Sequence, residues 1–197
     1  MRGIDKLDVD MAKTHKEENR RQGVRFFYFC VLQTDLLFRL FLGKPAVLKW
    51  SSTQQVKLPS LFINDVKVNA PQAILYIVSL KYTVMTAEIL NFFDEHASEE
   101  NSEETSRKVT EYCEQIEGLA AEWDLDLRSR SSEQAMYADL LLSIYASIIG
   151  IKRLTRSANS ETIDATTLRA ARRVIDGLLQ FTEKAIVPKE NGIVLIQ

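Results

Sequence analysis

The chain has 197 residues, of which 46% are hydrophobic and 26% are charged. This balance excludes a disordered chain, which would have less apolar side chain to bury and a larger net charge. Twenty-five basic and twenty-seven acidic residues leave a net charge of −2, so no net field attracts the chain to nucleic acid or to anionic lipid.

Seven glycines and four prolines are few for a turn-rich β architecture, so we expect an all-α fold in one domain over residues 20–187. Residues 1–19 alternate in charge and lack the apolar run of a signal peptide, and we expect them to form a helical lead-in. The first main helix is predicted over residues 12–42, with a second half that is apolar on most sides. Gly43 and Pro45 end it, because glycine favours left-handed backbone after a helix and proline prevents continuation.

Residues 46–71 show no helical period and contain Pro59 and Pro71. We expect a long ordered connection there, with a small hairpin at 61–68. The second helix, predicted over residues 72–93, is apolar nearly all round, which is typical of the middle of a helical bundle.

The second helix is also apolar enough to raise the question of a membrane span. Lys81 and Glu88 lie within it, and a lysine at the centre of a bilayer costs about 2.5–3.5 kcal/mol. We therefore predict a buried core helix and no membrane partner.

The third helix is the clearest amphipath, and a polar linker over residues 124–132 follows it. Its inward face is predicted to hold Val109, Tyr112, Cys113, Ile116, Leu119, Ala120 and Trp123. The fourth helix, over residues 133–154, carries a line of small residues that ends at Gly150 and would allow a neighbouring helix to approach closely.

The fifth helix is predicted over residues 162–186, and Pro188 ends it. Its inward face is predicted to hold Leu168, Ala171, Ile175, Leu178, Leu179 and Ile186. The whole pattern indicates a layered bundle of about five main helices, with the first, second and fourth inside and the third and fifth outside. A tail over residues 188–197 completes the chain.

No catalytic or metal-binding apparatus is recognisable in the sequence. Cys30 and Cys113 lie within apolar periodic segments and are expected to be buried, reduced thiols of an intracellular protein. His15 and His96 lie in charged surroundings without a partner at ligand spacing. Zinc, phosphate-loop and nucleophile motifs are absent, and the acidic stretch that begins at Asp94 has the wrong spacing for a helical metal-dependent enzyme. We therefore expect no enzyme, no metal and no cofactor.

Asp35 and Arg39 lie four residues apart on an otherwise apolar helix, with the acid first, which is the favourable order. One interpretation is a surface ion pair worth about 0.3–0.5 kcal/mol. The other is a partly buried pair that fixes how the first helix docks against the loop that follows it.

Hydroxyl and small side chains form a stripe on each of two apolar helices. These residues are Ser79, Thr83 and Thr86 on the second helix and Ser143 and Ser147 on the fourth. If the stripes face one another across a cavity, they supply the few polar groups that an apolar ligand pocket needs. The alternative is close packing, with the hydroxyls bonded to their own backbone.

Basic clusters occur at residues 20–25, 152–156 and 169–173. A DNA-reading role would need them on one face together with a groove-entering motif, and no such motif is present. The alternative, solvated structural charges, is favoured, so we expect no direct nucleic-acid partner.

The segment from Arg25 to Pro45 resembles the signature of the fungal-specific transcription factor domain, the middle homology region of fungal binuclear zinc cluster regulators. The residues assigned to it are Arg25, Phe29, Asp35, Arg39, Gly43, Lys44, Pro45 and Pro59. Phenylalanine replaces a tryptophan and lysine an arginine of the family pattern. The family's six-cysteine zinc cluster and the helical region that normally precedes the signature are absent here.

The resemblance implies a helical regulatory domain in the nucleus, or one that moves between nucleus and cytoplasm, which contacts proteins and in some members binds a small-molecule effector. A stand-alone adaptor or dimerisation module is the other possibility. The apolar run from Ile193 to Ile196 suggests exposed apolar surface that something must cover, and we expect a homodimer.

Overall fold

The computed structural model describes residues 14–48, 71–96, 103–130, 135–154 and 163–186. Within these ranges the chain forms helices and no strand, which confirms the all-α prediction. The helices are α1 (His15–Leu42), α2 (Pro71–Glu95), α3 (Glu103–Glu122), α4 (Leu125–Ser129), α5 (Ala135–Leu154) and α6 (Ala165–Ile186). The predicted hairpin at 61–68, Pro59 and the tail over 188–197 lie outside the described residues.

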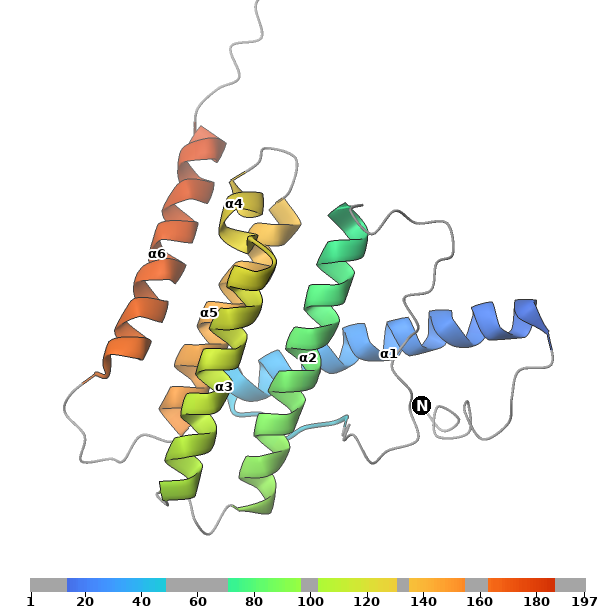
Figure 1. Cartoon of the computed structure of the whole chain (residues 1–197), viewed down its shortest axis with the longest axis horizontal. Helices are drawn as coiled ribbons and strands as arrows, with labels where there is room; N and C mark the ends of the chain where they lie inside the picture. The colour runs from blue at the N-terminus through green and yellow to red at the C-terminus, as the bar shows by residue number, and fades with distance from the viewer. Residues whose placement is uncertain (1–13, 49–70, 97–102, 131–134, 155–162, 187–197) are drawn as a thin grey trace, which may run out of the picture.

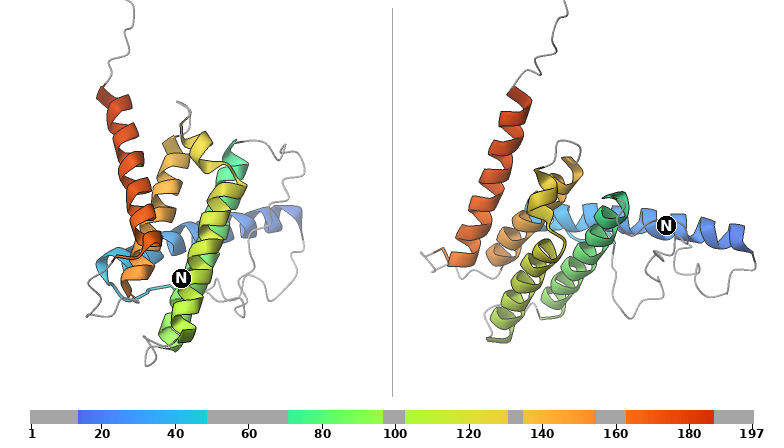
Figure 2. Two further views of the ribbon diagram at one scale, coloured as in Figure 1. Left: turned by 60° about the vertical axis from the view of Figure 1, so that its left-hand side comes forward. Right: turned by 45° about the horizontal axis from the view of Figure 1, so that its top comes forward.

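The long helices form a layer that one helix crosses. In Figure 1, α2, α3, α5 and α6 run side by side, and α1 crosses behind α2 at a steep angle. The two further views in Figure 2 agree, and they show the N-terminal half of α1 projecting past α2. One side of α1 therefore faces the layer, while the opposite side faces away from it.

Local signals account for the ends of α1. The side chain of Thr14 accepts a hydrogen bond of 3.1 Å from the N–H of Glu17 and so caps the helix, and Glu17 and Glu18 place negative charge in its first turn. Gly43 ends the helix with φ of 62°, the left-handed conformation expected for it, and its N–H donates to the carbonyl of Arg39.

Helix α5 is the centre of the bundle, because it contacts every other helix. Gly150 lies where α1 approaches α5, since a Cβ at this position would meet the Leu40 side chain at 3.5 Å. The line of small residues predicted on this helix is therefore a packing surface. The largest fully buried side chains come from five of the helices: Leu32, Leu40, Val78, Tyr82, Leu90, Val109, Ile116, Leu125, Tyr137, Ile144, Ile148 and Ile151.

The inward face predicted for the third helix is confirmed from Val109 to Ala120, and Trp123 is partly buried. The polar linker predicted after it is wrong in part, because residues 125–129 form the short helix α4. Asp124, with φ of 49°, turns the chain between the two helices. Leu125 is fully buried, and its burial holds α4 against the bundle.

The inward face predicted for the last helix is wrong. Leu168, Ile175, Leu178 and Leu179 are between 45% and 56% exposed, whereas Ala170 is fully buried. At Gly177 a Cβ would come within 2.9 Å of the Leu142 side chain, so α6 approaches α5 along its small residues. The apolar arc of α6 is wider than the surface that α5 offers, and the remainder of that arc faces outward.

The prediction that both cysteines are buried is wrong for one of them. Cys113 is buried on α3, but Cys30 is exposed on α1. Apolar residues occupy most sides of α1, and the layer covers only one of those sides. Helical periodicity therefore could not distinguish the covered side from the exposed one.

Two buried phenols make the fold sensitive to alkali. Burial raises the pKa of Tyr82 to about 12 and that of Tyr112 well above its ordinary value. Unfolded tyrosine loses its proton near pH 10. The contribution of these two tyrosines to the unfolding free energy should stay constant up to about pH 10 and then fall by at most roughly 1.4 kcal/mol per pH unit for each of them. Urea unfolding across this pH range measures the slope, and Tyr82→Phe should make it shallower. Ionisation of every tyrosine near pH 10 in the native chain would contradict this account.

Candidate functional site

Two of the signature residues, Asp35 and Arg39, lie at the junction of α1, the loop after it and the end of α2. Arg39 reaches from α1 to α2, where its guanidinium donates to both carboxylate oxygens of Asp94, one at 3.0 Å, and to the carbonyl of Leu90 at 3.2 Å. The last carbonyls of a helix lack partners within it, and α2 has no basic residue in its own last turn. Arg39 therefore supplies, from another helix, the positive charge that the C-terminal end of α2 needs.

Asp35 binds the loop that follows α1. One carboxylate oxygen of Asp35 accepts hydrogen bonds from the N–H groups of Val47, at 2.9 Å, and Leu48, at 2.8 Å. Asp35 and Arg39 thus act separately, one on the loop and the other on α2. The prediction that these two residues pair with each other, as a surface or a partly buried pair, is therefore wrong. The expected docking of the first helix against the following loop is supported for Asp35 alone.

The other signature residues in the described part of the chain also have structural environments. Arg25 is buried, and its guanidinium donates to Glu18 at 2.8 Å, which holds the pKa of that carboxyl below its usual value. Phe29 is 3% exposed and belongs to the core. Lys44 and Pro45 are exposed in the loop. Among the described signature residues, Phe29, Asp35 and Arg39 therefore hold α1 and the loop after it on the bundle.

Hydroxyl groups of both stripes form hydrogen bonds within the bundle. Thr83 donates to the carbonyl of Ser79, Ser147 to that of Ser143, and Ser143 to that of Asp139. Two tyrosines complete the set: Tyr82 bonds to Ser147, and Thr86 lies 3.0 Å from the Tyr112 hydroxyl. These contacts support the packing alternative. Neither tyrosine was predicted as a partner of these hydroxyls, although a buried tyrosine hydroxyl usually has a partner.

A cavity of about 280 Å³ lies elsewhere, between α4, α5 and α6. Its wall is apolar at Ala138, Leu141 and Leu142, and charged at the rim, where Arg173 and Asp126 lie 3.4 Å apart. None of the hydroxyl residues predicted to line a pocket lines this one. The stripes therefore give no support to a small-molecule site.

The basic clusters pair with carboxylates. On α1, Arg21 pairs with Glu17, as Arg25 does with Glu18. Arg169 of α6 donates two hydrogen bonds of 3.0 Å to the carboxylate of Glu117 on α3. Lys152 of α5 lies 3.8 Å from the carboxylate of Asp164. Ion pairs within the bundle thus occupy several of the cations that a nucleic-acid interface would need.

Among the residues that the structure describes, no group of three His, Cys, Asp or Glu side chains lies close enough to hold a metal ion. One helix there, Ala73–Glu95, is long and apolar enough to cross a bilayer, with a mean hydropathy of 1.5. Half of that span is buried inside the bundle, and the core helix of a soluble protein meets the same criterion.

The side of α1 that faces away from the layer is apolar and exposed. Phe27, Cys30, Thr34, Phe38 and Phe41 lie along it, and we call these five residues the α1 stripe. All five are exposed, with Phe27 at 65%, Phe38 at 54% and Phe41 at 42%. The only charged residues between Arg25 and Lys44 are Asp35 and Arg39, which bind the loop and α2.

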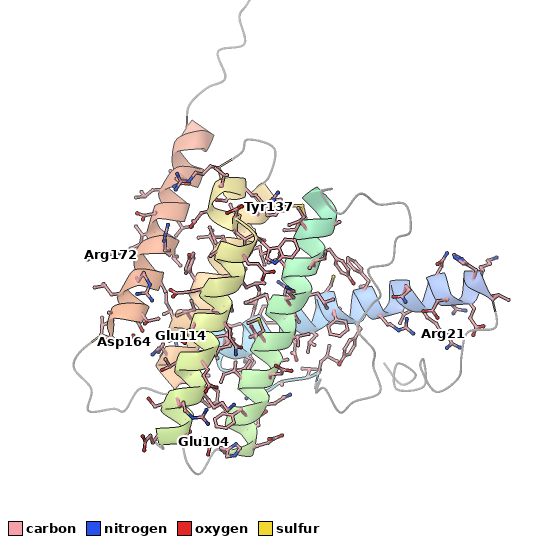
Figure 3. All side chains as sticks on the ribbon, viewed as in Figure 1. Arg21, Glu104, Glu114, Tyr137, Asp164 and Arg172 are labelled. Atoms are coloured by element: carbon pink, nitrogen blue, oxygen red, sulfur yellow. The ribbon has the colours of Figure 1, made fainter. Side chains whose placement is uncertain are left out.

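A second exposed apolar face lies on α6. Leu168, Ala171, Ile175 and Leu178 have the three- and four-residue spacing of a coiled-coil seam, and Leu179 extends it. We call these five residues the α6 stripe. Arg172 is exposed beside it, and Figure 3 shows this residue on the outer side of α6, with Asp164 at the N-terminal end of the helix.

A comparison with protein-family models, with curated proteins and with solved structures found no match to this chain. The resemblance to the fungal-specific transcription factor domain therefore rests on the signature residues alone and stays a prediction.

The Arg39–Asp94 contact should stabilise the fold more than an ordinary surface ion pair does. The Arg39 side chain is only 16% exposed and its hydrogen bonds to Asp94 are bidentate, so we expect a coupling free energy of about 1 kcal/mol. A double-mutant cycle with Arg39→Met and Asp94→Asn, followed by urea unfolding, measures it. The exposed pair of Arg107 and Glu111 on α3 is the matched control, for which about 0.3–0.5 kcal/mol is expected. Equal couplings for the two pairs would contradict the assigned role of Arg39.

Proposed function

We propose that this chain is a regulatory and protein-interaction domain of a fungal transcriptional regulator, which acts in the nucleus, catalyses no reaction and does not itself bind DNA. The observation that carries the proposal is the combination of a closed polar interior with open apolar faces. The hydroxyls of the stripes on α2 and α5, and the carboxylate of Asp35, are engaged in packing contacts, as is the Arg39–Asp94 pair. By contrast, all residues of the α1 stripe are exposed, and so are the four large side chains of the α6 stripe.

The α6 stripe fits an amphipathic helix of the regulator that carries this domain. Leu168, Ile175 and Leu178 provide the apolar seam, and the exposed charges of Arg172 and Asp176 lie beside it. Apolar positions at coiled-coil spacing with charged flanks are the surface that a partner helix binds. In this role the domain would hold the rest of the regulator in an inactive arrangement, as the family resemblance implies.

A nuclear reporter assay tests the proposal. The chain, inserted between a heterologous DNA-binding domain and an activation domain, should lower reporter output several-fold. Ile175→Glu should restore the output, because a charge in the seam opposes helix docking. Met136→Glu, at a residue of α5 that is 66% exposed and outside both stripes, is the matched control and should leave the repression intact.

Two results would contradict the proposed function. One is an unchanged reporter output with the wild-type chain. The other is submicromolar, salt-sensitive binding of duplex DNA by the purified chain, because such binding requires many phosphate contacts.

A further inference from the structure

The spacing of the residues in the α1 stripe is the same in both directions along the helix. Its residues follow one another at intervals of three, four, four and three, so Thr34 is its centre. Reversal about Thr34 exchanges Phe27 with Phe41 and Cys30 with Phe38. In an antiparallel pair of helices with a two-fold axis at Thr34, every stripe residue would therefore face a stripe residue of the other copy.

The side-chain sizes match in the antiparallel arrangement. Each Phe38 would oppose the small Cys30 of the other copy, and the two Thr34 side chains would meet at the axis. A parallel pair would instead place Phe38 against Phe38 and Cys30 against Cys30, which gives one crowded layer and one loose layer. Alternation of large and small side chains across facing positions gives the better packing.

The polar atoms of the α1 stripe do not depend on water for hydrogen bonds or for the solvation of charge. The Thr34 hydroxyl donates to the carbonyl of Cys30 at 3.1 Å, so its methyl group is free to pack. Partial burial raises the pKa of the Cys30 thiol, which therefore stays neutral at physiological pH. Burial of this stripe in an interface would consequently leave no charge and no hydroxyl without a partner.

We propose that a second copy of this chain covers the α1 stripe, in an antiparallel pair of α1 helices whose two-fold axis passes Thr34. The inference deepens the proposed function, since it names one partner of the interaction domain. The stripe runs over fifteen residues, from Phe27 to Phe41, whose fourteen steps cover about 21 Å of helix. A single helix face of this length lies at the small end of interface sizes, so we expect association on the order of micromolar.

Disulfide trapping with the full-length chain tests both the pair and its axis. Cys30→Ser combined with Thr34→Cys places one exposed thiol at the axis, while the native Cys113 remains buried. Under mild oxidation with glutathione disulfide we expect most of this variant to become a covalent dimer. The wild-type chain should form far less, because Cys30 opposes Phe38 rather than Cys30. Phe38→Cys in the wild-type background should join position 38 to Cys30 of the other copy, as peptide mapping would show.

The matched control places the thiol at Thr110 of α3, in the same Cys30→Ser background. Thr110 is also an exposed helical threonine whose hydroxyl donates to the carbonyl four residues earlier, at 3.0 Å from Ser106. We expect no trapping above the random rate there. Equal rates at positions 34 and 110, or faster trapping through Cys30 in the wild type, would overturn the proposal. So would slow maleimide labelling of the thiol at position 34 in a chain that stays monomeric, since the chain itself would then cover the stripe. These outcomes concern the purified chain and leave the reporter result for the α6 stripe unaffected.

Discussion

Arg39 fixes α1 to the bundle through directional hydrogen bonds to the C-terminal end of α2. The rest of the contact between α1 and the layer consists of apolar side chains such as Leu32, Leu36 and Leu40, which favour burial without selecting one position along the helix. The guanidinium selects that position, because Asp94 and the Leu90 carbonyl accept its hydrogen bonds only in one arrangement. Asp35, one turn earlier, then holds the loop beside α1.

This placement has a consequence for the other side of α1. Because both charged side chains of its second half bind protein groups, the outer side contains no charge that could keep it solvated. The α1 stripe is therefore a product of the same contacts that dock the helix. The sequence of α1 is apolar on most sides because one side belongs to the core and the other forms an interface.

Sequence periodicity predicted the helices well, because long apolar repeats and a glycine in left-handed conformation are local signals. The stop at Gly43 and the inward face of α3 are examples. Periodicity could not predict which apolar residues are buried, since burial depends on how much of the helix surface the neighbouring helices contact. That limitation explains the exposed Leu168 and Ile175 of α6 and the exposed Cys30 of α1. The five-residue helix α4 is too short to show a period.

The candidate site was predictable to a similar extent. The spacing of Asp35 and Arg39 identified both as important, but their partners lie thirteen and fifty-five residues away and could not be read from a helical pattern. The bonds of the hydroxyl stripes to Tyr82 and Tyr112 were not predicted, because helical spacing does not show which side chains of a neighbouring helix a hydroxyl meets. Side-chain polarity located these residues, and only the packing of the helices identified what they bind.

Sedimentation equilibrium tests most directly whether α1 is at once a core helix and an interface. The wild-type chain should shift from monomer to dimer as its concentration rises through the micromolar range. Phe38→Glu should remain monomeric with an unchanged unfolding temperature, because residue 38 is 54% exposed. Leu127→Glu, at a residue of α4 that is 71% exposed, should still dimerise. A wild-type chain that is monomeric at every concentration, or a Phe38→Glu variant that dimerises as the wild type does, would contradict the account.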